Sequence, residues 1–243
     1  MTVQVGSEAP FQFKQFSIAQ EKCAMKVGTD GVLLGAWTDV DGIGKILDIG
    51  TGSGLIAVML AQRTGENTQI HGVEIDNDAF LQAKSNMENS PWSSRLEAIH
   101  MAIQDFANNA DRQYDLIVSN PPFFSGGTFS DNQDRASVRH TVKLPHGDLL
   151  LAAKKLLLPS GKFCVILPFI EGLRFVELAE NYGFYCTRQT EVKPRADKPV
   201  ERLLLQFEQS EVTCETDSLN IHDTEGTYSW KYVQLTGDFY LKM

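Results

Sequence analysis

Short apolar runs alternate with segments of helical period from residue 45 onward. The runs typical of strands are Lys45 to Gly50, Gln69 to Asp76, Leu96 to Met101, Asp115 to Asn120 and Gly161 to Pro168, followed by two longer runs, Phe184 to Lys193 and Arg202 to Gln209. Leu55 to Gln62 is apolar nearly all round, as expected of a helix buried against a sheet. The alternation predicts an α/β unit with a mostly parallel seven-stranded sheet and helices on both faces.

The helical segments carry their own boundary signals. One helix is predicted from about Asp78, with Asp76 or Asn77 as its cap and Pro91 beyond its end. Others are predicted near residues 148–157 and from Glu171 to Gly183. Residues 1–44, with a helix candidate at 31–37, and residues 210–243 fall outside this pattern. We therefore expect an N-terminal segment 1–44, a domain 45–209, and an extension 210–243 packed on the same domain.

The composition predicts a soluble cytoplasmic protein. With 243 residues and 42% hydrophobic content, the chain can bury one large core. Its four cysteines are scattered without a CxxC pair, which favours reduced thiols, and the histidines lack metal-ligand spacing, so no metal is expected. The N-terminus has no basic region followed by an apolar run, and the longest uncharged apolar stretch, residues 163–170, is too short to cross a bilayer.

A net charge of −9 counts against nonspecific nucleic-acid binding, because such binding depends on Lys and Arg. Residues 208–225, however, carry six acids and no Lys or Arg, so most of the excess lies in one tract. Arg135, Arg139 and Lys143 fall in a nine-residue stretch without an acid. A local basic site on a mixed surface therefore remains compatible with the composition.

A glycine-rich turn joins the first predicted strand to the first helix. It comprises Asp48, Ile49, Gly50, Thr51, Gly52, Ser53 and Gly54, at the place where an open α/β sheet binds ligands. Glu74, followed by Ile75, ends the second strand 20 residues after Gly54, where a carboxylate can accept hydrogen bonds from ribose hydroxyls. A glycine turn without a ligand is the alternative.

Details of this turn favour S-adenosylmethionine over a dinucleotide. Counted from Gly50, the sixth position of G-x-G-x-x-G is Leu55, which loses the close approach needed beside a pyrophosphate. S-adenosylmethionine has no phosphate, and its cationic methionine end suits Asp48. After the third strand, Asp105 is a candidate acceptor for the adenine amine of the cofactor, and Phe106 is a candidate for covering the adenine ring. The alternative for Asp105 is a helix cap or a loop acid.

The fourth strand runs into Asn120, Pro121, Pro122 and Phe123. An aromatic exocyclic amine is a poor nucleophile, and two acceptors on its N–H bonds can turn its lone pair toward a methyl donor. The Asn120 side-chain oxygen and the Pro121 carbonyl are candidates for these acceptors, and Phe123 offers a face on which an extruded base can stack. An ordinary turn is the alternative, but its position after the glycine turn and Glu74 favours the catalytic interpretation.

These motifs resemble those of the amino-group methyltransferases with an (N/D/S)PP(Y/F/W/H) motif, and more narrowly the bacterial tRNA adenine-37 N6-methyltransferases. The narrower resemblance rests on FKQFSIAQEKCAMKVGTDGVLLGAW at residues 13–37, DIGTGSGLIAVMLAQR, NPPFF, the run at residues 139–141 and the ending LTGDFYLKM. It implies a Rossmann-like class I methyltransferase fold, a monomer, and methyl transfer to N6 of adenine 37 in the anticodon loop of a valine tRNA. It also implies that residues 1–44 cover the cofactor and substrate, with Thr29 near the cofactor; a helix N-cap at Thr29-Asp30 is the alternative.

Candidate RNA contacts follow the NPPFF run and occupy a later turn. They are Arg135, Arg139, His140, Lys143, Lys193, Arg195 and Lys198, although such groups are also typical of solvated faces. A protein-glutamine methyltransferase is a rival hypothesis, but usually has Tyr at the fourth motif position and a larger N-terminal domain. The other rival hypotheses are a guanine N2-methyltransferase, a DNA adenine methyltransferase and a noncatalytic scaffold that binds the cofactor. The intact Asn120 argues against the scaffold.

Overall fold

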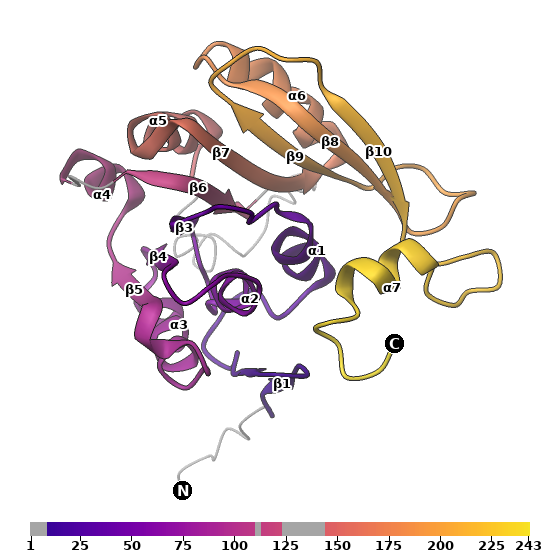
Figure 1. Ribbon diagram of the computed structural model, residues 1–243, viewed down its shortest axis with the longest axis horizontal. Coiled ribbons are helices and arrows are strands. Elements are labelled where there is room, and N and C mark those ends of the chain that lie inside the picture. The colour runs from indigo at the N-terminus through magenta and orange to yellow at the C-terminus, as the bar shows by residue number, and fades with distance from the viewer. Residues whose placement is uncertain (1–8, 110–112, 123–143) are drawn as a thin grey trace, which may run out of the picture.

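The computed structural model describes residues 9–109, 113–122 and 144–243, and its main sheet is shown in Figure 1. Within these ranges, eight strands form the sheet in the order β10-β8-β9-β7-β6-β3-β4-β5. Their bounds are β3 Lys45–Ile49, β4 Gln69–Glu74, β5 Leu96–His100, β6 Tyr114–Ser119, β7 Leu157–Pro168, β8 Tyr185–Lys193, β9 Arg202–Glu208 and β10 Glu215–Asn220. Neighbours are parallel except for β9, which runs antiparallel to both β7 and β8. The carboxyl ends of β3, β4 and β6 therefore meet at one edge.

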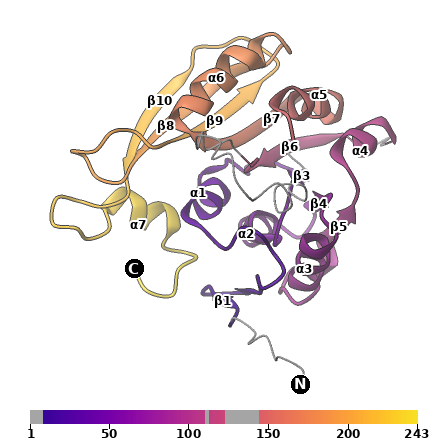
Figure 2. The same cartoon turned by 180° about the vertical axis from the view of Figure 1, so that it is seen from behind.

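Helices cover both faces of this sheet (Figures 1 and 2). They are α1 Thr29–Trp37, α2 Leu55–Arg63, α3 Asn77–Glu88, α4 Ile103–Asn109, α5 His146–Leu156, α6 Phe169–Glu180 and α7 Trp230–Thr236. Alternate strand residues face opposite sides, so Ile46 packs with α1 and α2 whereas Leu47 packs with α4 and α5. Two apolar cores result, one on each face.

The α/β fold predicted from the sequence is confirmed, with one difference in the sheet. The eighth strand, β10, lies within residues 210–243 and pairs in parallel with β8. Its sequence, ETDSLN, is polar, and only Leu219 is buried. An edge strand needs no apolar face of its own because its backbone pairs with the neighbour, so hydrophobic patterning could not reveal it. The short helix α4 was also missed.

The N-terminal segment packs against the C-terminal end. Strands β1 Phe11–Gln12 and β2 Ser17–Ile18 pair as a short hairpin. The Phe13 and Phe16 rings stack at 4.6 Å, and Phe13 bridges to Tyr240 in the last residues of the chain. The two ends of the sequence are thereby joined beside α2 and α3.

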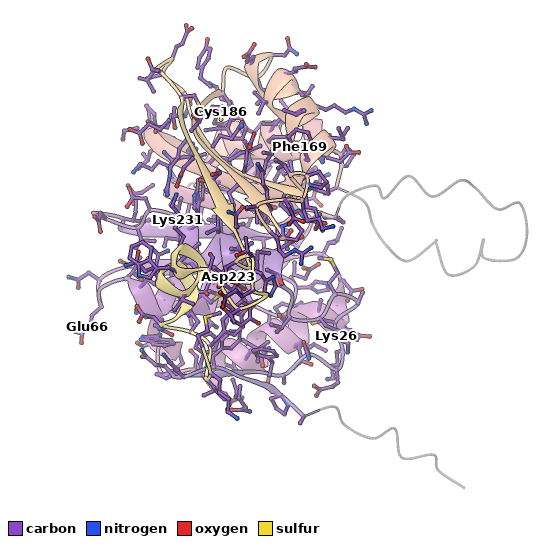
Figure 3. All side chains as sticks on the ribbon, turned by 90° about the vertical axis from the view of Figure 1, so that its right-hand side faces the viewer. Lys26, Glu66, Phe169, Cys186, Asp223 and Lys231 are labelled. Atoms are coloured by element: carbon purple, nitrogen blue, oxygen red, sulfur yellow. The ribbon has the colours of Figure 1, made fainter. Side chains whose placement is uncertain are left out.

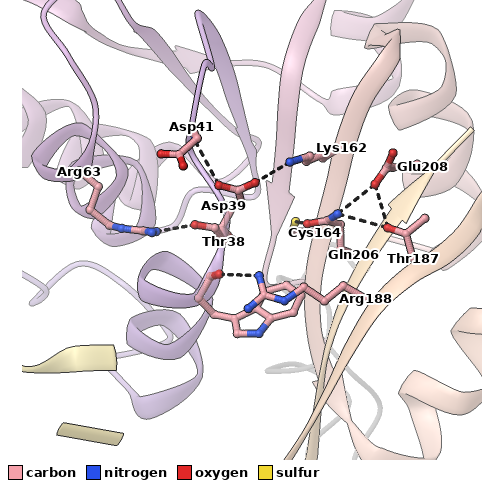
Figure 4. A network of polar contacts seen from close by, with 11 residues as sticks. Thr38, Asp39, Asp41, Arg63, Lys162, Cys164, Thr187, Arg188, Gln206 and Glu208 are labelled. Atoms are coloured by element: carbon pink, nitrogen blue, oxygen red, sulfur yellow. Dashed lines mark hydrogen bonds and ion pairs between the residues drawn. The ribbon is translucent and has the colours of Figure 1, made fainter. Parts of the chain in front are cut away.

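Polar contacts fix the end of α1 against the middle of the sheet (Figure 4). Lys162 on β7 binds the Asp39 carboxylate at 2.6 Å, and the bond lowers the pKa of that carboxyl. The Arg188 guanidinium on β8 lies 4.2 Å from the Trp37 ring centre. Both contacts join residues more than a hundred positions apart, and so position α1 relative to β7 and β8.

Candidate active site

The glycine turn after β3 is held by backbone hydrogen bonds. The amides of Gly50 and Thr51 both donate to the Val73 carbonyl, at 2.9 and 3.2 Å. Gly50, Gly52 and Gly54 have φ values of +69°, +57° and +80°, a region in which a Cβ is strained. The turn thus needs glycine at three alternate positions, which explains the G-x-G-x-G spacing.

Gly54 is the N-cap of α2 and lies beside α3. A Cβ at Gly54 would lie 3.4 Å from the Ala83 Cα, which is an ordinary van der Waals contact. The positive φ, rather than this neighbour, therefore requires glycine here.

Glu74 is buried at the end of β4, and its carboxylate links the turn after β3 to the turn after β4. Its Oε2 accepts from the Gly52 amide at 2.9 Å, and its Oε1 accepts from the Ile75 and Asp76 amides at 2.9 and 3.0 Å. A carboxylate with three backbone donors has a fixed orientation and still has free lone pairs. The next side chain, Ile75, is 41% exposed and so leaves an apolar surface beside this carboxylate.

Asp48 lies at the floor of the turn and is fully buried. The Thr51 hydroxyl donates to its Oδ2 at 2.6 Å. Burial nevertheless raises the pKa of Asp48 to about 7, because the loss of water outweighs this hydrogen bond. A negative charge at this position would be stabilised by a cation bound nearby.

Asn120 follows β6 and lies beside the glycine turn. Ser119, its neighbour, pairs with Ile49 across the sheet and donates its hydroxyl to the Ile49 carbonyl at 2.8 Å. The Oδ1 atom of Asn120 is buried and accepts no hydrogen bond from the described residues. An unsatisfied buried acceptor costs about 1–3 kcal/mol, so its retention points to a functional use. Pro121, which follows, is buried.

A cavity of about 420 Å³ opens at this edge of the sheet. Three parts of the chain line it: the glycine turn with Asn120, the segment from Met25 through the start of α1, and the ends of β8, β9 and β10. The lining includes Lys26, Thr29, Asp30, Gly50, Thr51, Gly52, Ser53, Asn120, Val192, Pro194, Glu201, Arg202 and Ile221. Thr29, Gly50, Thr51 and Gly52 thus share one cavity with Asn120, whereas Asp48, Gly54, Glu74 and Ile75 do not line it.

An ion pair joins α1 to β9 at the wall of this cavity. The Arg202 Nε at the start of β9 binds Asp30 Oδ2 in the first turn of α1 at 2.8 Å. Both side chains are more than two-thirds buried and both line the cavity. Residues 172 positions apart therefore close this side.

Side-chain amides hold the N-terminal segment against the turn. Asn86 on α3 donates to the carbonyls of Ala19 and Ser53, both at 2.8 Å, and accepts from the Ala19 amide. Gln82, one turn earlier, accepts from the Lys22 amide at 3.4 Å. Sequence reasoning missed these two residues, although a pair of amides at i and i+4 beside the apolar face of α3 was an available signal.

The structure places the other predicted residues as follows. Thr29 lines the cavity as the first residue of α1, whose N-cap is Gly28, so the alternative that Thr29 is an N-cap is wrong. Asp105 is exposed on α4 and Phe106 is buried in the core, and neither lines the cavity. Their adenine contacts stay predictions.

Lys193, Arg195 and Lys198 lie at or after the end of β8, with Arg195 paired to Asp197. Phe123, Arg135, Arg139, His140 and Lys143 lie outside the described residues.

Within residues 9–109, 113–122 and 144–243, no three His, Cys, Asp or Glu side chains group as metal ligands. In the same ranges, no helix has the length and apolar character needed to span a membrane.

Known structures share this fold. A predicted O-methyltransferase from Agrobacterium tumefaciens superposes with a TM-score of 0.67, covering 86% of this chain and 96% of its own, at 17% identity. A glycopeptide N-methyltransferase solved with S-adenosylmethionine gives a TM-score of 0.55 over 76% of this chain and all of its own, at 12% identity. At these identities the similarity establishes the fold alone.

Sequence comparison is more specific. The methyltransferase small domain family model matches residues 27–168, more than half of the chain, including the glycine turn and Asn120. A protein from Photorhabdus laumondii, named tRNA1(Val) (adenine(37)-N6)-methyltransferase, is 46% identical over 231 residues, which cover 95% of each chain. The chain therefore belongs to the tRNA1(Val) (adenine(37)-N6)-methyltransferase family.

Proposed function

We propose that the protein transfers a methyl group from S-adenosylmethionine to N6 of adenine 37 in the anticodon loop of a valine tRNA. The observation that carries the proposal is the buried Oδ1 of Asn120, which accepts no hydrogen bond from the described residues and belongs to a residue that lines the same cavity as the glycine turn. The 46%-identical relative carries the same activity in its name. A tRNA substrate also implies a cytoplasmic enzyme, and we expect a monomer.

The residues present fit S-adenosylmethionine. The glycine turn brings backbone without side chains to the carboxyl edge of the sheet, and among the described residues no cation is near enough to shift the pKa of the buried Asp48. We assign the turn, with Thr29, Asp48, Gly50, Thr51, Gly52 and Gly54, to the methionine end of the cofactor. Glu74 and Ile75 are assigned to its ribose and adenine, with Asp105 and Phe106 as further adenine contacts.

The protein's part in the reaction is orientation. When bound, the cofactor supplies an electrophilic methyl group on sulfur. Asn120 Oδ1 accepts one N6–H bond of the target adenine and the Pro121 carbonyl accepts the other, which turns the nitrogen lone pair away from the ring. With its lone pair so oriented, N6 would form a bond to this methyl group as the sulfur–methyl bond breaks, and one N6 proton would leave to solvent. Phe123 is proposed to stack on the flipped base.

The target base reaches this site from a loop, where bases are already partly unstacked. The proposed phosphate contacts are Arg135, Arg139, His140, Lys143, Lys193, Arg195 and Lys198.

The test is incubation with methyl-labelled S-adenosylmethionine and, separately, unmodified bulk tRNA, duplex DNA and release-factor or ribosomal protein fractions. The expected result is label in tRNA, recovered as N6-methyladenosine after digestion to nucleosides. Mapping by mass spectrometry should place it at position 37 of valine tRNA. Label in glutamine, guanine or DNA would overturn the assignment.

A further inference from the structure

Aromatic side chains gather in the turn between β10 and α7. Trp230, at the start of α7, is 70% exposed, and Tyr228 is 47% exposed. The His222 and Tyr228 rings stack at 5.1 Å with an interplanar angle of 22°, and Tyr228 stacks on the buried Tyr232 at 5.2 Å. An indole exposed to this extent contributes little to a core, so its presence needs another reason.

This turn is continuous with the wall of the active-site cavity. Ile221 and Pro194 line the cavity, and His222 is the next residue after Ile221. The His222 amide donates to the Pro194 carbonyl at 2.9 Å, and the Ile221 amide donates to the Lys193 carbonyl at 2.9 Å. The aromatic turn and the β8–β9 turn project on the same side of the molecule, to the right in Figure 1 and to the left in Figure 2. In Figure 3, viewed from that side, Asp223 marks the aromatic turn.

The charge on this side disfavours binding through phosphates alone. Asp223 accepts from the Thr227 hydroxyl at 2.6 Å, which lowers the pKa of its carboxyl and keeps it ionised. Lys231 is paired with Asp217, and Arg195 with Asp197. Beside the proposed phosphate contacts Lys193 and Lys198, an RNA that approaches the cavity here meets these carboxylates, so contacts that need no charge would add to its attraction.

Resting on the proposed function, we propose that Tyr228 and Trp230, with His222 beneath Tyr228, form a stacking surface for unpaired nucleotides that flank the target adenine. Loop nucleotides are recognised through stacking on aromatic and His side chains, and this contact depends weakly on sequence. The surface adjoins the cavity wall, where nucleotides next to a base inserted into the cavity would lie. It also explains how a chain of net charge −9 binds RNA.

The experiment measures the affinity of an unmodified anticodon stem-loop for the full chain by fluorescence anisotropy. Trp230→Ala and Tyr228→Ala should each weaken binding by about tenfold or more. Tyr228→Phe should bind like the wild type, because the ring is kept. Trp230 fluorescence should be quenched on RNA binding, and thermal unfolding of Trp230→Ala should match the wild type, because its side chain is exposed.

Two controls make the result specific. Tyr185→Ala removes a half-buried tyrosine at the opposite end of β8 and should leave RNA affinity unchanged. Plotted against the logarithm of salt concentration, the affinity of Trp230→Ala should fall with the wild-type slope, because no phosphate contact is lost.

The possible failures are distinguishable. If the wild type forms N6-methyladenosine in tRNA but Trp230→Ala and Tyr228→Ala bind RNA normally, the stacking surface is wrong and the proposed function stands. Altered self-association with unchanged RNA affinity would likewise show that the surface binds another copy of the chain. If the wild type neither binds nor methylates RNA, the proposed function itself is wrong.

Discussion

The two sides of the active-site cavity are built in different ways. The cofactor side is the glycine turn, whose residues 50–53 line the cavity and are held by backbone hydrogen bonds and by the Glu74 carboxylate. The other side, which we call the rim, is made from side chains distant in sequence, among them the Asp30–Arg202 ion pair. A turn held by its own backbone keeps one shape for every reaction, whereas side chains at a rim can be selected for one substrate. We therefore propose that the first side binds the cofactor and that the second positions the substrate.

Asn120 lies where these two sides meet, and its loss should have the largest effect. Asn120→Ala removes the buried acceptor Oδ1, and we expect methyl transfer to fall by about 10²–10³-fold, as for removal of one preorganised polar group elsewhere. Cofactor affinity should change little. Single-turnover methylation of tRNA and calorimetric titration of S-adenosylmethionine measure the two quantities separately.

Asn120→Asp is the matched control, since it keeps an acceptor at the same place and should retain more activity than Asn120→Ala. Near-normal methylation by Asn120→Ala would show that the two-acceptor mechanism is wrong. Equal losses of cofactor affinity and rate would instead place Asn120 on the cofactor side alone.

Asp48 tests the cofactor side through pH. Its pKa is raised from 3.8 to about 7, so the folded chain holds a proton that the unfolded chain has lost between these values. The contribution of Asp48 to stability should therefore fall as pH rises from about 4 to about 7, by at most about 4 kcal/mol, and stay level above that. Asp48→Asn should abolish this decline while weakening binding of the cationic cofactor. Denaturant unfolding from pH 4 to 8 gives the first effect; an unchanged pH slope would contradict the assignment.

Glu74 should govern cofactor affinity without affecting the chemical step at saturation. Glu74→Ala removes an acceptor for Gly52 and the proposed ribose contact, so we expect affinity for S-adenosylmethionine to fall by about 10–100-fold. Glu66→Ala, which removes an exposed carboxylate in the turn after α2 (Figure 3), is the control and should bind normally. A loss of maximal rate at saturating cofactor would be inconsistent with this division of roles.

The same contrast explains what the sequence could predict. The glycine turn and Glu74 were found because local backbone geometry dictates their residue types and spacing. The Asp30–Arg202 pair was missed because neither residue is unusual alone and only the fold brings them together. Strand β10 was missed because backbone pairing holds its polar residues at the sheet edge. Hydrophobic periodicity therefore predicted the fold, and local residue spacing predicted the glycine turn. Neither could predict the contacts at the rim.

The smallest effect is expected at the rim. Asp30→Asn and Arg202→Met each break the ion pair that joins α1 to β9, and we expect kcat/KM for tRNA to fall by about five- to tenfold, mainly through KM. The double variant should lose less than the sum of the two single losses, because the shared ion pair is removed only once. Cofactor affinity should stay within about twofold of the wild type, since backbone bonds fix the other side. Arg174→Met, which breaks the Arg174–Glu171 pair on α6, is the control and should leave both quantities unchanged. Additive losses, or a large loss of cofactor affinity, would show that the two sides do not act separately.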